Sequence, residues 1–257
     1  MAINAKDFTF CDKKLSDFGF IIANFDKDND DSASAGNIEV VTSRPPNSSR
    51  NYIHGFNHGD PITLTFQIVK FDFDKCICSE TPVTFTEQQN LMKWLIKTNY
   101  NYMYFDNKPE TSFNVVMKVT PKKIGGNIYG FEITAINDSI YSYTNELTFS
   151  VNNNGFLCLN NSSGYIYPKV TITAIADGDV SVGIEGDRTS TILNCIKDEV
   201  ITIDSENCTI VSSSGLHNLS TDFNFEFFRV MDGNIKKSIV ENAKVSMTYR
   251  EKRMVVI

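Results

Sequence analysis

The stretch Ile62–Ile68 reads Ile-Thr-Leu-Thr-Phe-Gln-Ile, in which apolar and polar residues alternate. Alternation with a period of two places the apolar side chains on one face of an extended strand, as expected for a half-buried strand in a sheet. Similar segments recur along the chain, so this pattern decides the fold class. The further predicted strands are Phe113–Val119, Ile128–Ile136, Val170–Ile175, Val180–Ile184, Val200–Ile203, Phe223–Phe227 and Val245–Tyr249.

Turn-forming pairs separate these segments, namely Gly125-Gly126, Asp177-Gly178 and Asp232-Gly233. Glycine and aspartate favour the backbone conformations that tight turns require. Many short strands punctuated in this way are typical of β-sandwiches and jelly rolls. The sequence therefore predicts a mainly β protein.

One segment has a helical pattern. Thr86, followed three residues later by Gln89, predicts a capping box at the start of a helix. Leu91 and Leu95 lie four residues apart, which places them on one apolar face. We expect the helix to pack on a sheet, with Trp94 in the core. The fold class is thus all-β with one helix.

The length of 257 residues suits one large or two ordinary domains. Two stretches rich in Asn, Ser and Gly, residues 150–155 and 160–164, indicate a junction. We expect an N-terminal domain of residues 1–146 and a C-terminal domain of residues 147–257.

The composition sets limits on function. Hydrophobic residues make up 41% of the chain, enough to bury a core, and the net charge of −7 argues against non-specific binding of nucleic acid by the whole surface. The chain has no apolar segment near the roughly 20 residues of a membrane helix and no secretory signal pattern at its start. We therefore expect synthesis in a cytoplasm, no membrane insertion, and six free thiols.

Three arrangements of cysteine, aspartate or histidine resemble parts of metal sites, but none is predicted to bind a metal. Cys76 and Cys78 lack the second closely spaced pair that a zinc site requires. The acidic stretch 26–36 begins with the aspartate spacing of an EF-hand, but Asp31 replaces the glycine at its sixth position, so we favour a solvated loop. His54 and His58, with Asp60 nearby, lie in a segment whose glycines disfavour a helix.

No motif of catalysis is present. The sequence contains no G-x-S-x-G elbow, Walker motif or G-x-G-x-x-G loop. His217 lies in the Ser/Asn-rich stretch Ser212–Asn218. We therefore predict no catalytic residues, metal ligands or cofactors, and expect a protein that is not an enzyme.

Several motifs, in order, resemble the distal tail proteins of long-tailed bacteriophages (siphophages). The segment Phe8–Ile22, with Ser16-Asp-Phe-Gly19, resembles the start of that family. The other similar segments are Leu91–Leu95, Asn101–Pro109, Asp138–Tyr143, Tyr167–Ile172 and Ile203–Glu206. Ser139 stands where the family usually has proline, and Asp232-Gly233 stands where it often has Pro-Gly.

This resemblance implies an N-terminal ring-forming β-sandwich domain and a C-terminal galectin-like or jelly-roll β-sandwich. It implies a homo-hexameric hub at the tail tip of the virion, which joins the tail tube protein to a tail-associated hub or lysin protein. A receptor-binding protein is a further partner in some phages. DNA contacts the hub only in transit through its lumen.

The stretch Ser43–Gly59 is long and rich in turn formers, and we expect an extended arm that contacts the adjacent subunit. Pro45-Pro46 stiffens its start, and its apolar anchors are Tyr52, Ile53 and Phe56. Arg44 and Arg50 are expected to pair with an acidic loop such as Asp26–Asp31 of a neighbour. A disordered loop is the alternative.

Two other functions remain open. Jelly-roll domains commonly bind glycans, so a carbohydrate-binding module for host adhesion is the alternative function. Its exposed aromatic candidates are Tyr165, Tyr167 and Tyr249. An enzyme such as a glycosidase ranks last, because no carboxylate pair is indicated.

Overall fold

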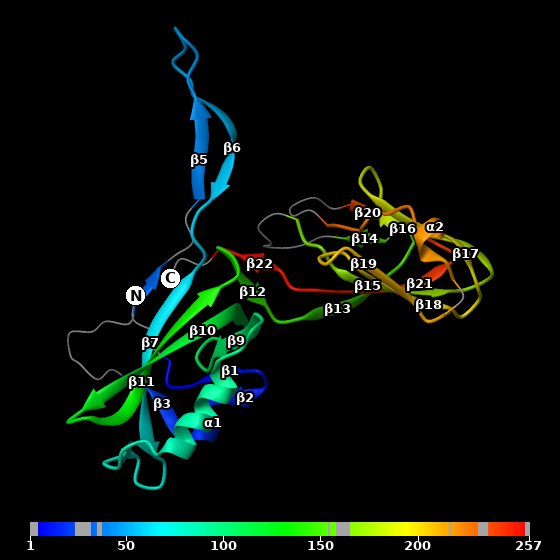
Figure 1. Ribbon diagram of the computed structural model, residues 1–257. Coiled ribbons are helices and arrows are strands. Elements are labelled where there is room, and N and C mark those ends of the chain that lie inside the picture. Colours follow the sequence, from blue (N-terminus) through cyan, green and yellow to red (C-terminus); the bar gives the residue numbers. More distant parts are fainter. Residues whose placement is uncertain are drawn as a thin grey trace. The chain divides into compact units, whose positions relative to one another are not determined.

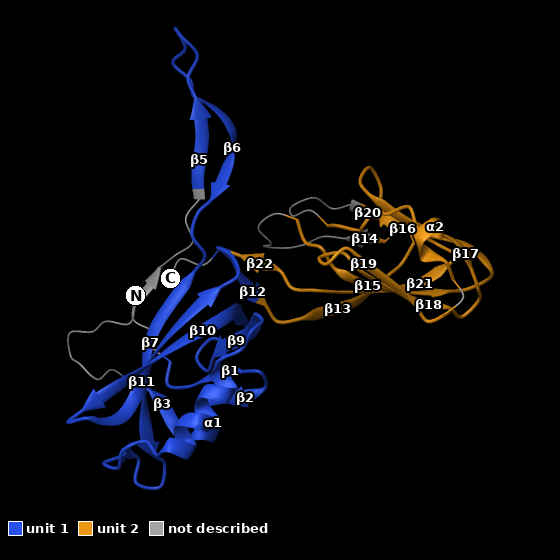
Figure 2. Ribbon diagram, in the orientation of Figure 1, with its two compact units in different colours: residues 1–143, 254–257 blue, residues 144–253 orange. Residues whose placement is uncertain are grey.

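The computed structural model describes residues 5–23, 32–34, 38–153, 155–157, 165–215, 217–230 and 236–254. The chain divides into two compact units (Figure 2). Unit 1 comprises Met1–Tyr143 with Met254–Ile257, and unit 2 comprises Thr144–Arg253. Each unit has its own hydrophobic core.

Unit 1 is built on one large antiparallel sheet (Figure 1). Its main path runs in the order β2-β1-β9-β10-β11-β7-β3, while β4 and β8 pair with β7, and β12 pairs with β10. The strands are β1 (Phe8–Phe10), β2 (Lys13–Lys14), β3 (Phe20–Ile22), β4 (Ser32–Ser34), β7 (Thr63–Asp72), β8 (Ile77–Cys78), β9 (Asn101–Phe105), β10 (Thr111–Ile124), β11 (Asn127–Asn137) and β12 (Ser142–Thr144). The predicted alternating strand at Ile62–Ile68 is confirmed from Thr63 onward, as the first part of β7.

The sheet of unit 1 curls until its two ends meet. Ile22 on β3, the last strand of the path, donates its N–H to the carbonyl of Lys6, just before β1, at 2.9 Å. The ring of Phe8 on β1 lies 5.5 Å from the ring of Phe66 on β7. Three strands separate β1 from β7 in the path, and neighbouring strands lie about 4.8 Å apart in a flat sheet. Such close approach therefore requires two facing layers, as in a β-sandwich.

The helix α1 (Phe85–Leu95) packs on this core through Leu91, Trp94 and Leu95. The predicted N-cap at Thr86 is wrong: the cap is Thr84, whose hydroxyl accepts from the N–H of Glu87 while the Glu87 carboxylate accepts from the N–H of Thr84. The helix starts at the capping box of Thr84 and Glu87, because Thr84 has the extended backbone of an N-cap. A short 3₁₀ helix, η1 (Leu15–Phe18), also packs beside α1.

The stretch predicted as a long loop is a β-hairpin instead. Strands β5 (Ile38–Ser43) and β6 (Tyr52–His58) pair only with each other and extend away from the sheet of unit 1 (Figure 1). Its glycine, histidine and asparagine residues hid the strand pattern, because these residues are depleted from strands or neutral there. The hairpin is called the arm below.

Unit 2 is a β-sandwich of two antiparallel sheets, in the orders β13-β21-β15-β18-β19 and β14-β20-β16-β17. Its strands are β13 (Leu147–Val151), β14 (Phe156–Leu157), β15 (Lys169–Ala174), β16 (Gly178–Ile184), β17 (Thr189–Cys195), β18 (Val200–Asp204), β19 (Thr209–Ser212), β20 (Lys236–Glu241) and β21 (Ala243–Tyr249). The short strand β22 (Lys252–Arg253) belongs to neither of these two sheets. A single helical turn, α2 (Leu219–Asp222), follows β19. Inward-facing aliphatic residues of both sheets form the core. The all-β fold class is confirmed.

One predicted strand of unit 2, Phe223–Phe227, is wrong. Phe223 is buried and forms an isolated bridge with Ile192, but Phe225 has a φ of 56° and is exposed. A bulky residue in the left-handed region interrupts an extended strand. The apolar alternation of this segment therefore places Phe223 and Phe227 against the core without strand pairing.

Candidate functional site

The arm is held in register by a bulge. Val40 pairs with Phe56 and Thr42 with Ile53, with a register shift between Val41 and Thr42. Ile53 and Phe56 are three residues apart, so a regular strand would place them on opposite faces. The extra residue in the bulge shifts the alternation of β6 by one residue, so Val40, Ile53 and Phe56 lie on the same face.

This apolar face is unburied. The exposed fraction is 46% for Val40, 63% for Ile53 and 59% for Phe56, and on the other face Tyr52 is 56% exposed. A two-stranded hairpin in water has marginal stability, and contiguous exposed apolar surface typically marks an interaction site. The structure thus brings together the three predicted apolar anchors, Tyr52, Ile53 and Phe56, on one exposed hairpin.

The tip of the arm, residues 44–51, is organised by local hydrogen bonds. The N–H of Ser48 donates to the carbonyl of Pro45 at 3.1 Å, and the guanidinium Nε of Arg44 donates to the carbonyl of Ser48 at 2.6 Å. Arg44 and Arg50 are both exposed, and neither forms an ion pair with a residue that the structure describes. The acidic stretch Asp26–Asp31, their expected partner on a neighbour, lies outside the described residues.

The two histidines of the arm have separate neighbours. The Nε2 atom of His54 contacts the hydroxyl of Ser43 across the hairpin, and the ring of His58 lies 6.1 Å from the ring of Tyr141. Among the described residues, the arrangement of donors that could hold a metal ion is elsewhere, in unit 2. Cys76 and Cys78 are exposed thiols of unit 1.

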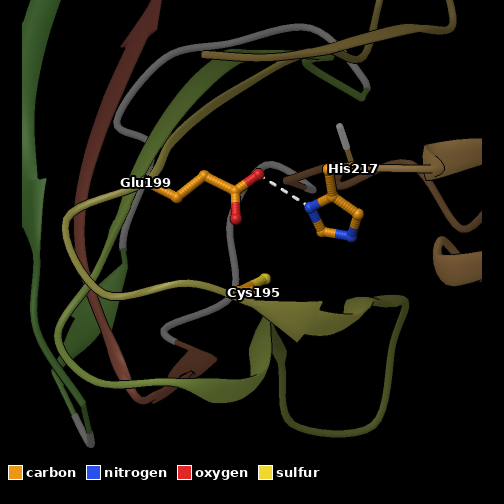
Figure 3. A group of neighbouring side chains, drawn as sticks. All are labelled: Cys195, Glu199 and His217. Atoms are coloured by element: carbon orange, nitrogen blue, oxygen red, sulfur yellow. Dashed lines mark hydrogen bonds and ion pairs between the residues drawn. The ribbon is translucent and has the colours of Figure 1, made fainter. Parts of the chain in front are cut away.

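A buried polar cluster in unit 2 was missed by the sequence reasoning. It consists of Cys195 at the end of β17, Glu199 just before β18, and His217 between β19 and α2 (Figure 3). Figure 3 shows the three side chains pointing toward one another, and their donor atoms lie within 4.8 Å of each other. The spacing of 22 residues between the first and the last gives no motif, so only the fold brings them together.

The cluster is closed to solvent. The side chains of His217 and Glu199 are 3% and 2% exposed, and Nδ1 of His217 lies 2.7 Å from Oε1 of Glu199. Burial acts to raise the pKa of Glu199, but hydrogen bonds from Ser212, the N–H of Ile196 and His217 outweigh it, and the pKa is lowered. Burial, with the nearby carboxylates, raises the pKa of the Cys195 thiol to about 11.

Comparison with known proteins identifies the family. Residues 3–139 match a family described as the phage tail protein N-terminal domain, and residues 140–249 match the phage tail C-terminal domain. The chain belongs to this phage tail protein family. It is therefore a component of a phage tail. No curated protein matches the sequence.

A solved structure shares the fold of this tail protein over nearly its whole length. It is the Dit (gp 19.1) protein of phage SPP1, described as "a Paradigm of Hub Adsorption Apparatus in Gram-positive Infecting Phages". The TM-score is 0.64 with 11% sequence identity, and the match covers 96% of this chain and 98% of that one. The tail protein thus has a Dit-like fold. In the part of the chain that the structure describes, no helix is long and apolar enough to cross a membrane.

Proposed function

We propose that this tail protein is the structural subunit of the tail-tip hub, without catalytic activity. Six copies form a ring that joins the tail tube protein to the tail-associated hub or lysin protein, and DNA passes through the lumen. A receptor-binding protein is a further partner. The subunit is made in the host cytoplasm and resides at the tail tip of the virion. Family membership and the Dit-like fold support this role.

The single observation that carries the proposal is the exposed apolar face of the arm. Burying apolar surface contributes about 25 cal/mol per Å², so a hairpin with Ile53 and Phe56 about three-fifths exposed gains from a partner surface. A ring is made of heterologous contacts, in which one patch of each subunit meets a different patch of the next. The arm supplies the first patch, and the neighbouring unit 1 supplies the second.

The arm is suited to this contact because it is preorganised. The ladder of β5 and β6 fixes its register, and the hydrogen bonds of Ser48 fix its tip. An ordered element loses less conformational entropy on binding than a disordered loop. Tyr52, Ile53 and Phe56 are therefore the proposed anchors, with Arg44 and Arg50 at the rim of the interface.

The alternative function, glycan adhesion by unit 2, has weaker support. The rings of Tyr165 and Tyr167 lie 6.5 Å apart, but the guanidinium of Arg229 lies 4.2 Å from the centre of the Tyr165 ring. Arg229 is itself held by Asp187 at 2.9 Å. One face of the Tyr165 ring is thus covered by a cation, which leaves less aromatic surface for stacking on a sugar. A glycan array of the purified protein tests this alternative.

The test of the hub is made in assembled particles. Phages carrying the double change Ile53→Ser and Phe56→Ser are expected to give few complete tails, and electron microscopy of the tips should show missing or incomplete rings. The control is Val211→Ser in unit 2, where an equally exposed apolar residue, at 63%, is removed. Normal tail yield with normal six-fold rings in the double variant would show that the arm is not part of the joint.

A further inference from the structure

The cluster of Cys195, Glu199 and His217 is not explained by a hub role, and it contains one group whose hydrogen bonding is informative. Both ring nitrogens of His217 face acceptors: Nε2 lies 2.9 Å from the carbonyl of Leu193 and 3.4 Å from Oδ2 of Asp222, while Nδ1 faces Glu199. A neutral imidazole has only one N–H donor. The two sides of the ring therefore cannot both be satisfied by a neutral histidine beside an ionised Glu199.

Donation from Nε2 to the carbonyl of Leu193 is one of the two tautomers open to a neutral ring, and the other donates from Nδ1 to Glu199 and leaves Nε2 facing that carbonyl. With Nε2–H donating to Leu193, the lone pair of Nδ1 points at Oε1 of Glu199, 2.7 Å away. Two acceptors in contact repel unless a cation lies between them, and that cation is either a second proton or a metal ion. A histidine that ligates a metal usually donates its other N–H to a carbonyl or carboxylate, as Nε2 does here.

Cys195, whose thiol lies 3.6 Å from the carbonyl of Ile192, favours the metal ion over the second proton. Its sulfur adds a third donor, which a bound proton does not need, and the combination of thiolate, imidazole and carboxylate is typical of zinc ligands. The surroundings are negative: Glu199, Asp179 and Asp222 all act to raise the pKa of the Cys195 thiol, after the larger effect of burial. Such a field disfavours a free thiolate but favours a divalent cation, which deprotonates a thiol that coordinates it.

We propose that Cys195, Glu199 and His217 bind a divalent cation of the zinc class, through Sγ, a carboxylate oxygen and Nδ1. Ligand atoms around a tetrahedral zinc ion lie roughly 3.3–3.8 Å apart, given its bond lengths of about 2.0–2.3 Å. The present separations extend from 2.7 Å to no more than 4.8 Å, so shifts of about 1 Å complete the site. A fourth ligand, a water molecule, would complete a tetrahedral site.

The ion would connect the end of β17, the start of β18 and the segment before α2. Since these parts come from both sheets of unit 2, the site would clamp one end of the sandwich. Its role is structural: metal binding to the folded state alone stabilises that state by mass action.

The experiment uses the full chain, freed of metal by dialysis against a chelator under reducing conditions. We expect isothermal titration with zinc to show one equivalent bound per chain. Cobalt(II) should give the near-ultraviolet absorption band of a thiolate–cobalt bond. Cys195→Ser should abolish that band, and Cys195→Ser or His217→Gln should weaken zinc binding by more than the roughly 10–100-fold that loss of an outer-shell partner costs.

The matched controls are Cys78→Ser and His54→Gln, which remove an exposed thiol and an exposed imidazole of unit 1 and should leave affinity and spectrum unchanged. If the site variants do not fold, the cobalt spectrum of the unaltered protein decides. Absence of a thiolate band, or of zinc binding by the folded protein, would overturn the proposal and leave a second proton as the cation between His217 and Glu199.

Discussion

The indole N–H of Trp94 donates a hydrogen bond of 2.8 Å to the backbone carbonyl of Phe10. This bond connects α1 to β1 in the sheet of unit 1. The indole also stacks on Phe18, with ring centres 4.4 Å apart, and on Phe8 at 5.5 Å. Trp94 is 5% exposed, so the sequence-based placement of this residue in the core is confirmed.

Replacing Trp94 should therefore destabilise unit 1 selectively. Trp94→Phe keeps a ring but leaves the buried carbonyl of Phe10 without its donor, which costs about 1–3 kcal/mol. The free energy of unfolding is measured from the slowest amide hydrogen exchange in β1 and β9. The control, Phe85→Ala, removes a 73% exposed ring from the same helix and should change stability by no more than about 0.5 kcal/mol. Equal effects of the two changes would contradict this account of the indole.

The N-cap of α1 gives a second prediction. Thr84→Ala removes the hydroxyl that accepts from the N–H of Glu87, and loss of an N-cap costs about 1 kcal/mol. Thr86→Ala, within the first turn, should have little effect. Trp94 is the only tryptophan of the chain, so its fluorescence during urea unfolding reports on unit 1 alone. A larger loss of stability in Thr86→Ala than in Thr84→Ala would mean that Thr86 is the N-cap, as the sequence suggested.

The two possible capping boxes illustrate what the sequence can and cannot decide. Thr84 with Glu87, and Thr86 with Gln89, both fit the pattern, and only the backbone conformation at Thr84 distinguishes them. Alternating segments such as Ile62–Ile68 were predictable because burial on one face imposes a period of two. The strands of the arm were not, since no core selects their residues.

The buried cluster of unit 2 was even less predictable from the sequence than the cap of α1. Cys195 and His217 have no spacing that marks a site, and their proximity depends on how β17, which lies in one sheet, packs against β18 and the segment before α2 at the other. Family resemblance, carried by the order of several weak motifs, was in contrast accessible from the sequence, and the matches to residues 3–139 and 140–249 confirm a phage tail protein.

Acid should weaken unit 1 through Glu87. Burial acts to raise its pKa, but the hydrogen bonds from Thr84 and the charge of Lys70, 3.0 Å away, outweigh this and hold the pKa below its ordinary value of 4.5. A carboxylate with a lowered pKa in the folded state binds protons more readily when unfolded, so its contribution is complete above pH 4.5 and is lost as pH falls through the lower folded value.

The measurement is the urea midpoint of unit 1 by Trp94 fluorescence as pH is lowered. The unaltered protein should lose stability more steeply below pH 4.5 than Glu87→Gln, whose side chain does not titrate. At neutral pH the unaltered protein should be the more stable of the two. Parallel pH profiles would show that Glu87 does not contribute to the acid sensitivity.

The cysteines should react at different rates in the metal-free protein. Cys76, Cys78 and Cys208 are exposed, so we expect them to react rapidly with a thiol reagent at neutral pH. Cys195 is 2% exposed with a pKa of about 11, and it should react only as the protein unfolds. In denaturant, without prior reduction, six thiols per chain are expected. Fewer than six would indicate a disulfide, and a fast Cys195 would contradict its burial.

The division into independently folding domains, which the sequence placed after residue 146, is the last prediction. The two core clusters share no residue, since one is drawn from residues 5–135 and the other from residues 151–247. Thr144 lies at the start of unit 2, where its N–H donates to the carbonyl of Glu251 at 3.0 Å and its hydroxyl accepts from the N–H of Glu251. A unit with its own core is expected to fold alone.

We therefore expect the fragment of residues 144–257 to fold cooperatively, as followed by circular dichroism during thermal unfolding. A fragment of residues 152–257 lacks β13, which pairs with β21 along Leu147–Val151, and lacks the bonds of Thr144. It should melt at a lower temperature, because β21 becomes an unpaired edge and Val151 no longer covers the core. An unfolded longer fragment would show that unit 2 does not fold alone. Equal melting temperatures of the two fragments would show that β13 does not stabilise unit 2.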